Sequence, residues 1–462
     1  MNRDASIRPS EEHPFYWRYG GQTSVLLGGS DEDNAFQWTG TILTDHLDTL
    51  AACGGNFIRN TMSDRDDGNI YAFEQIEEGT YDLERWNGEY FRRLSTFLEE
   101  TERRGIVVQI TLWDQHDLSS QAWERHPWNP ARNVNYDGDN VSDPRAFFNT
   151  VRNRNTAVLP HQERFVDRVL DLSLEYGHVL YNINNESWTG LAWELYWADR
   201  IHGMAKGRER NAYVTAMHLS PSTSVRAFMS HRDRLNFAEI SQNNQVSMGA
   251  SGQEHMDNIL LWRDLIAKQS PAPLNNEKVY GAGEGETTQF GTGEEARRRY
   301  WRNIFGGCAC TRFHRPIPTM ESGGGLGLSD SAQRTIRSAR LFCDAFDVPG
   351  SAPHNEVFVS RDADTAYCLA APGSRYAFYF TNGGSVEFDP WLYVDSFRLR
   401  WLNVAESRWE EPEGLVAVEW ESYRIWSGEP ANVPLHGRCR IECPGPGPWV
   451  AILMPDSTAD RP

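Results

Sequence analysis

Short apolar runs alternate with helical patterns from about residue 22 to residue 346, and this alternation most restricts the folds open to the chain. Residues 106–113 form the clearest buried strand, and residues 86–104, which end at Gly105, form the clearest amphipathic helix. Eight strand-then-helix units of this kind predict an α/β fold, the (β/α)8 or TIM barrel. A doubly wound open sheet is the alternative, but no glycine-rich phosphate-binding sequence follows the first strand.

The pattern changes after Pro349-Gly350. Helical periodicity ends, and short alternating β runs follow, separated by glycine and proline. We therefore predict a barrel over residues 1–348 and a small antiparallel β-sandwich over residues 349–462. The sandwich could bind sugar or brace the barrel. We favour bracing, because no triplet of exposed tryptophans is evident in its sequence.

Composition excludes some classes of partner. The net charge of −19 argues against nucleic acid and anionic membranes, and mildly against polyanionic substrates unless a local basic patch overrides it. No apolar run is long enough to span a bilayer, and the first twenty residues lack a secretory pattern. The chain as it stands is expected to be cytoplasmic, or secreted if a signal has been trimmed from it. The seven cysteines are scattered, so we expect ordinary thiols and neither a disulfide framework, a metal site nor a cofactor.

The tripeptide Asn-Asn-Glu closes two separate apolar runs, at residues 179–186 and 273–277. Its glutamates, Glu186 and Glu277, fall at the ends of the fourth and seventh predicted strands, where barrel enzymes carry their catalytic groups. Two carboxyl groups facing each other across a cleft are what retaining glycoside hydrolysis requires. The alternative is that both are ordinary surface carboxylates of an acidic protein. The 17 tryptophans fit a sugar-binding cleft or a large core equally well.

These elements resemble the clan of (β/α)8 retaining glycoside hydrolases, which places an Asn-Glu pair after strand four and a second Glu at the end of strand seven. Asn185-Glu186 and Glu277 match that pattern, and Arg59 matches the clan's arginine that pairs with the nucleophile. Residues 13–17, 25–30, 36–38 and 300–307 are similar to bacterial cellulase-like barrels with a C-terminal sandwich, including the apiosidase-like group. The resemblance implies that Glu186 is the acid/base, Glu277 the nucleophile and Asn185 the residue that holds a sugar hydroxyl.

Further candidates for substrate contact lie at the ends of predicted strands, or are tryptophans that could stack on a sugar: Trp38, Trp113, Asp114, His116, Trp188, His218, Gln242, Asn243, Arg312 and His314. Glu284 and Glu286 are rival nucleophiles, ranked lower because their glycine neighbours would position a nucleophile poorly. Residues 117–160 lack clear periodicity, and so long a loop on a barrel's active face is usually a cleft wall or lid.

The leading hypothesis is therefore a cofactor-independent glycoside hydrolase acting on an oligosaccharide or polysaccharide. A non-catalytic carbohydrate-binding protein and a transglycosidase are the alternatives. The sequence leaves open the sugar, its linkage, exo or endo action, and whether the chain forms a homo-oligomer.

Overall fold

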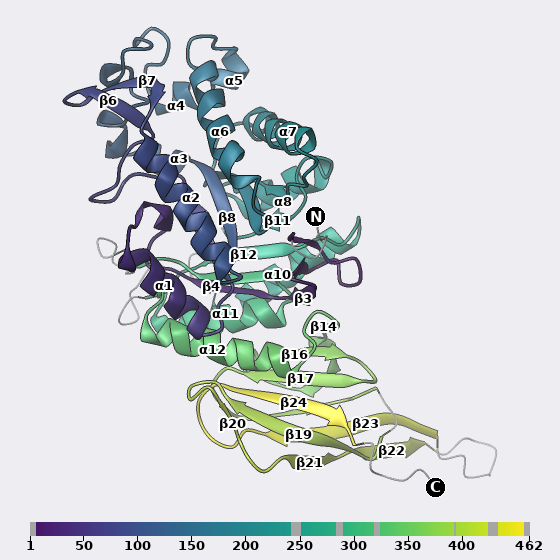
Figure 1. Ribbon diagram of the computed structural model, residues 1–462. Coiled ribbons are helices and arrows are strands. Elements are labelled where there is room, and N and C mark those ends of the chain that lie inside the picture. Colours follow the sequence, from purple (N-terminus) through teal and green to yellow (C-terminus); the bar gives the residue numbers. More distant parts are fainter. Residues whose placement is uncertain are drawn as a thin grey trace.

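The computed structural model describes residues 6–241, 251–282, 290–317, 324–391, 394–423 and 433–456 (Figure 1). These residues form an eight-stranded parallel sheet surrounded by helices, followed by antiparallel sheets. The predicted barrel and the β-rich unit after it are both confirmed. No helix in the described ranges combines the length and apolar character needed to cross a membrane.

The barrel strands follow one another in chain order, and the last, β13, pairs in parallel with the first, β4. Between the fifth and sixth strands the contact is a backbone bond from the Asn236 amide to the Val214 carbonyl oxygen, 2.7 Å long. The strands are β4 (Leu26–Gly29), β5 (Phe57–Thr61), β8 (Val107–Asp114), β9 (Val179–Asn185), β10 (Val214–Thr215), β11 (Ala238–Glu239), β12 (Leu274–Val279) and β13 (Cys310–Phe313).

The strand residues are buried because helices cover the outside of the barrel and side chains fill its inside. The main helices are α1 (Thr41–Ala52), α2 (Gly88–Arg103), α6 (Leu159–Ser173), α7 (Leu191–Gly207), α8 (Pro221–Ser230), α10 (Gly252–Ala267), α11 (Gly293–Phe305) and α12 (Asp330–Ala345). Helix α2 starts later than the sequence pattern indicates, because the Asn87 side chain accepts the Glu89 amide and caps it there.

A small N-terminal sheet of β1 (Arg8–Pro9), β2 (Trp17–Tyr19) and β3 (Gln22–Ser24) precedes the barrel. Its Trp17 is fully buried, and the indole Nε1 donates to Asn275 Oδ1 over 3.0 Å at the start of β12. Asn275 Nδ2 also lies 3.4 Å from Gln109 Oε1 of β8. Trp17 therefore fills the amino end of the barrel and leaves the carboxyl end for chemistry.

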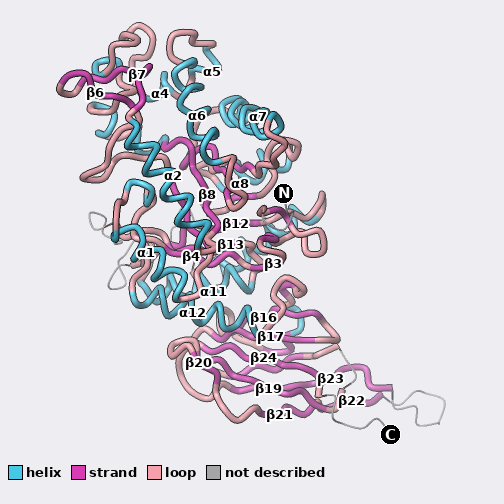
Figure 2. Tube along the Cα trace, viewed as in Figure 1, coloured by secondary structure: helices cyan, strands magenta, loops and turns pink. Residues whose placement is uncertain are grey.

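Insertions enlarge the end of the molecule that lies opposite the sandwich. The hairpin of β6 (Phe73–Glu77) and β7 (Thr80–Trp86) was not predicted, and it contacts the long loop through a bridge between Tyr81 and Asn133. That loop holds only short helices: α3 (Gln115–Leu118), α4 (Pro144–Phe147) and α5 (Thr150–Asn153). Figure 2 shows these loops and short elements gathered beyond one end of the barrel.

The C-terminal part contains two antiparallel sheets, ordered β14-β16-β17-β24-β19-β20, with β21 beside β19, and β15-β18-β23-β22. The strands are β14 (Ala352–Pro353), β15 (Phe358–Ser360), β16 (Ala366–Ala371), β17 (Arg375–Phe380), β18 (Ser385–Phe388), β19 (Ser396–Asn403), β20 (Arg408–Trp409), β21 (Gly414–Ala417), β22 (Glu419–Tyr423), β23 (Val433–Glu442) and β24 (Trp449–Pro455). A domain division at residues 348 and 349 stays a prediction; it falls between α12 and β14.

The barrel and the larger C-terminal sheet share one continuous apolar core. Trp301 of α11 stacks on Tyr379 of β17 with ring centroids 5.4 Å apart and planes 17° apart. Arg302 of α11 makes an ion pair of 2.9 Å with Asp364, and Ser338 Oγ of α12 donates to the Val404 carbonyl oxygen over 2.7 Å. Figure 1 shows α11 and α12 lying against this sheet. These contacts favour bracing over an independent binding module.

We predict that Tyr379→Ala lowers the free energy of unfolding by about 3–5 kcal/mol, because it leaves a cavity beneath Trp301. Urea unfolding followed by tryptophan fluorescence and by far-UV circular dichroism should show one shared transition. Val359→Ala, at a side chain 47% exposed, should change little and serves as the control. Two separate transitions in the wild type would contradict a shared core.

Candidate active site

Glu186 and Glu277 both lie in the interior at the carboxyl end of the barrel, 4% and 0% exposed. Glu186 directly follows β9 and has a φ of 55°, a left-handed conformation that is rare for residues other than glycine. Glu277 lies within β12, and its amide donates to Ser241 Oγ over 2.7 Å. Backbone strain of this kind concentrates at functional sites, which makes Glu186 a stronger candidate than its sequence motif alone.

Arg59 of β5 connects Glu277 with Asn185, the last residue of β9 and the neighbour of Glu186. Its Nε lies 3.2 Å from Glu277 Oε1, and its NH2 group donates to Asn185 Oδ1 over 2.8 Å. A third contact, of 3.3 Å, joins its NH1 group to Asp33 Oδ2. The contact between Arg59 and Glu277 expected from the sequence is therefore present.

Lys278 connects the same groups from the other side. The pairing of β12 with β13 shifts register between Asn276 and Val279, so that Glu277 and its neighbour Lys278 both reach side chains of the barrel interior. Lys278 Nζ donates to Asn185 Oδ1 over 2.7 Å and to Glu186 Oε1 over 2.5 Å. The two glutamates thus belong to one network that runs through Arg59, Asn185 and Lys278.

Asp33, in the loop after β4, supplies the negative charge that this group of cations needs. Its carboxylate lies 3.0 Å from Arg312, 3.4 Å from Arg65 and 3.6 Å from Arg315, in addition to Arg59. Burial alone would raise the pKa of Asp33, but His314 and the arginines around it hold this pKa well below its usual range. Burial also lowers the pKa of His314, so at neutral pH the arginines supply the positive charge.

Glu239 of β11 is a second buried carboxyl group beside Glu277. Its Oε1 accepts the Ser241 amide over 2.6 Å, and Ser241 Oγ accepts the Glu277 amide. Burial, with the charge of Glu277, raises the pKa of Glu239 well above its usual value. Burial raises the pKa of Glu277 too, but Arg59, Arg312 and Lys278 oppose it. The cations beside Glu277 therefore favour ionisation of Glu277 over ionisation of Glu239.

Asn185 and Asp114 complete the network on the side of β8 and β9. Asn185 Nδ2 donates to Asp114 Oδ1 over 2.9 Å, and Arg65 NH1 donates to Asp114 Oδ2 over 3.2 Å. The amide of Asn185 is thereby held on both its oxygen and its nitrogen. Such fixed geometry is what a residue that orients a sugar hydroxyl requires.

The other predicted contact residues are dispersed. His314 lies within 3.6 Å of Asp33 and packs on Tyr280, with ring centroids 4.4 Å apart. His218 forms a bridge with Ser187, and burial lowers the pKa of His218 to about 4. Trp38 packs against His46, outside the carboxylate network.

Trp188 and His116 lie nearer the surface: Trp188 is 45% exposed, and His116 is an exposed residue of α3. Gln242 and Asn243 lie outside the described residues, as do the rival nucleophiles Glu284 and Glu286.

Trp113 does not lie where a substrate would bind. Successive side chains of a strand point to opposite faces, and Asp114 takes the inner position. The Trp113 ring is 2% exposed and packs among Trp193 and Trp197 of α7 and Phe165 of α6. It belongs to the layer between barrel and helices.

Sequence reasoning missed Asp33, Lys278 and Glu239 as members of the site, whereas Asp114 was among the predicted contact residues. Asp33 and Glu239 each lie at or just after a barrel strand's carboxyl end, a position that could have singled them out. Lys278 had no such signal, because only the register shift in β12 turns it inward.

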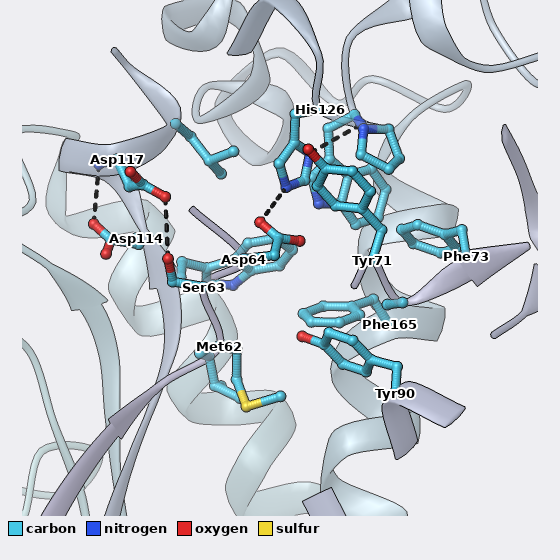
Figure 3. Close-up of a pocket in the computed structure, with 16 residues that line it drawn as sticks. Met62, Ser63, Asp64, Tyr71, Phe73, Tyr90, Asp114, Asp117, His126 and Phe165 are labelled. Atoms are coloured by element: carbon cyan, nitrogen blue, oxygen red, sulfur yellow. Dashed lines mark hydrogen bonds and ion pairs between the residues drawn. The ribbon is translucent and has the colours of Figure 1, made fainter. Parts of the chain in front are cut away.

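Figure 3 shows a small pocket beside the long loop, whose lining includes Asp114 but neither Glu186 nor Glu277. His126 Nε2 lies 3.2 Å from Asp64 Oδ1, and Ser63 Oγ donates to Asp117 Oδ2 over 3.1 Å. Burial and the charge of Asp114 raise the pKa of Asp117 to about 6. The cavity volume of about 20 Å³ suits roughly one water molecule and is too small for a sugar ring. Within the described ranges, no three His, Cys, Asp or Glu side chains converge as metal ligands would.

One family model and several solved structures are similar to this chain. A family model described as a domain of unknown function, DUF6298, matches residues 64–257. A search of curated proteins gives no match. A solved glycoside hydrolase covers 99% of this chain and 98% of its own, at 12% identity and a TM-score of 0.66.

Two further solved structures are similar. A glycoside hydrolase family 5 protein from Bacteroides vulgatus covers 99% of this chain and 94% of its own, at 12% identity and a TM-score of 0.64. A family 5 mannosidase from Rhizomucor miehei covers 76% of this chain and 99% of its own, at 13% identity and a TM-score of 0.53. The chain has a (β/α)8 glycoside hydrolase-like fold.

We predict that Asp33→Asn lowers the free energy of unfolding at neutral pH by about 3–5 kcal/mol, because it leaves buried arginines without their anion. The folded-state pKa of Asp33 is depressed, so its contribution is present above the unfolded value of about 4 and is lost as pH falls below it. Urea unfolding across this range measures both effects. Asp48→Asn, an exposed partner of Arg104, is the control and should change little. A constant difference down to pH 2 would contradict the assignment.

Proposed function

We propose that the protein is a retaining glycoside hydrolase that uses Glu277 as nucleophile and Glu186 as acid/base. The network that joins these two buried glutamates through Arg59, Asn185 and Lys278 is the observation that carries the proposal. The fold comparisons support it, since the similar structures are described as glycoside hydrolases. Their sequence identity is low, so the activity rests on the site itself.

In the first step a Glu277 carboxylate oxygen attacks the anomeric carbon as the glycosidic bond breaks. Glu186 donates its proton to the leaving oxygen, and a glycosyl ester forms on Glu277. In the second step Glu186 takes a proton from water, the water oxygen bonds to the anomeric carbon, and Glu277 leaves as a carboxylate. Arg59 stabilises Glu277 as a carboxylate before the first step and after the second. Asn185 is held in place to bind the sugar hydroxyl next to the anomeric carbon.

Lys278 adds a feature to this scheme. Its ammonium group contacts Glu186, and burial lowers the pKa of Lys278, an effect that Glu186 opposes and Arg59 reinforces. The cation of Lys278 therefore favours the ionised form of Glu186, and Glu186 regains its proton from the attacking water in the second step. Lys278 acts through Glu186 and is a positioning residue.

We predict that Glu277→Gln abolishes hydrolysis of every glycoside, because the nucleophile is lost. Glu186→Gln should lower kcat/KM of substrates with poor leaving groups by about 10²–10⁴-fold, yet leave much of kcat/KM for dinitrophenyl glycosides, whose leaving group needs no proton in the first step. The measurement is kcat and kcat/KM on paired substrates, including mannosides because one similar structure is a mannosidase. Glu102→Gln, at a surface carboxylate with 52% exposure, is the control.

Unchanged turnover in either active-site variant would refute the assignment. Sugar binding without hydrolysis in the wild type would instead support a non-catalytic binding protein. Transfer of the glycosyl group to added acceptor sugars in preference to water would identify a transglycosidase.

For Lys278 we predict that Lys278→Met moves the basic limb of the pH profile of kcat/KM to higher pH. A cation beside a carboxyl group favours its ionised form, so removing the cation lets the acid keep its proton longer. Lys278→Arg retains the charge and should retain the wild-type limb. Identical profiles for wild type and Lys278→Met would show that Lys278 does not act on the acid.

A further inference from the structure

The turn that follows Glu186 separates two hollows. Thr189 and Gly190 line both of them. The smaller hollow, of about 160 Å³, also contains Trp188 and Arg152. The larger, of about 390 Å³, also contains Arg226. The smaller hollow is therefore lined from two residues after the proposed acid/base, and the larger one from three residues after it.

The charged side chains around these hollows are arginines. Arg145 and Arg152 line the smaller hollow, and Arg226 lines the larger one. No Asp or Glu is among the residues that line either hollow. This is unexpected in a chain of net charge −19, where acidic side chains outnumber Lys and Arg by 64 to 45.

The three arginines also lack the partners that other exposed arginines have. Arg92 and Arg103, for example, make ion pairs with glutamates one helical turn away. In the part of the chain that the structure describes, Arg145, Arg152 and Arg226 make no ion pair with a carboxylate, and Arg226 Nε donates only to the Ser222 carbonyl oxygen, over 3.1 Å. Exposed guanidinium groups of this kind are free to bind an anion.

Trp188 gives the smaller hollow a surface for a sugar ring. Its backbone amide donates to Gln115 Oε1 over 3.0 Å, and Asn184 Nδ2 lies 3.3 Å from the same oxygen. The turn is thus fixed to β9 while the indole remains 45% exposed. An exposed aromatic face stacks on the C–H face of a sugar, and the neighbouring guanidinium groups would then meet its charged substituent.

We propose that the substrate is an acidic oligosaccharide, and that a carboxylate or sulfate on the sugar of the leaving-group side binds to the arginines around the turn of residues 188–190. This inference rests on the proposed function, because Glu186 protonates the leaving oxygen and the turn continues from Glu186. The local positive charge outweighs the net negative charge of the chain, since fields from nearby groups dominate within about one Debye length.

The test compares acidic oligosaccharides with neutral counterparts of the same backbone. Oligogalacturonides are paired with their carboxyl-reduced forms, and sulfated galactan oligosaccharides with their desulfated forms. Binding is measured by calorimetry with Glu277→Gln, and hydrolysis by kcat/KM with the wild type. We expect at least about tenfold preference for the acidic member of one pair, decreasing between 50 and 500 mM salt because of screening. The pair that shows it distinguishes carboxylate from sulfate.

The double variant Arg145→Gln, Arg152→Gln and the single variant Arg226→Gln identify which hollow binds the anion. The ratio of acidic to neutral affinity should fall about tenfold in the variant of that hollow. Arg92→Gln, with a side chain 73% exposed, removes the same charge elsewhere and should leave the ratio unchanged. Circular dichroism checks that each variant folds.

The outcomes separate the two proposals. Equal affinity for both members of each pair, binding of neither, or a ratio that no arginine variant alters would overturn the acidic-substrate inference. Hydrolysis confined to neutral members would overturn it too, while the glycoside hydrolase assignment would stand. Selective binding of an acidic member without hydrolysis of any substrate would overturn the hydrolase assignment and keep the acidic ligand.

Discussion

The guanidinium group of Arg59 is the interaction on which the rest of the site depends. It is completely buried, and it reaches Glu277 of β12, Asn185 of β9 and Asp33 after β4. A buried cation requires anions and acceptors within reach, so these separate parts of the barrel are held in register by the cost of leaving Arg59 unpaired. The planar guanidinium group places its three nitrogens apart, so that each one faces a different partner: Nε faces Glu277, NH1 faces Asp33 and NH2 faces Asn185.

The register shift in β12 determines which cation each of the two glutamates contacts. In a regular strand Glu277 and Lys278 would point to opposite faces. Because the shift directs both inward, Glu277 meets Arg59 while Lys278 meets Glu186. Each carboxylate of the pair therefore has its own cation, and Asn185 Oδ1 accepts from both cations. By contrast, the pKa of Glu239 is raised by burial and by the charge of Glu277.

The sequence predicts the barrel well because each strand is a buried run and is followed by a helix whose start and end can be recognised. It predicts the Glu pair and Arg59 for the same reason, since strand ends meet at one face of a barrel. The roles of Lys278 and Asp33 in the site depend on strand pairing and on contacts between residues far apart in the chain. A register shift leaves no mark in the residue pattern, and Asp33 meets Arg312 from 279 residues away. Trp113 shows the converse: one position along β8 separates a buried aromatic contact from the charged interior occupied by Asp114.

The net charge of the chain and its similarity to other barrels do not by themselves select a substrate. They constrain other properties of the protein. Barrel closure fixes the positions of strand ends, so similar barrels keep the same architecture at 12–13% identity. The segments after β8 and β9 are free of that constraint, and here they supply Arg145, Arg152 and the exposed Trp188. A net charge of −19 belongs to the chain as a whole, and its field is screened within about 10 Å, whereas an arginine in a hollow would contact an anionic ligand directly. On our proposal, substrate selection therefore follows from the loops around Glu186, and the chemistry of bond cleavage from the strand ends beneath them.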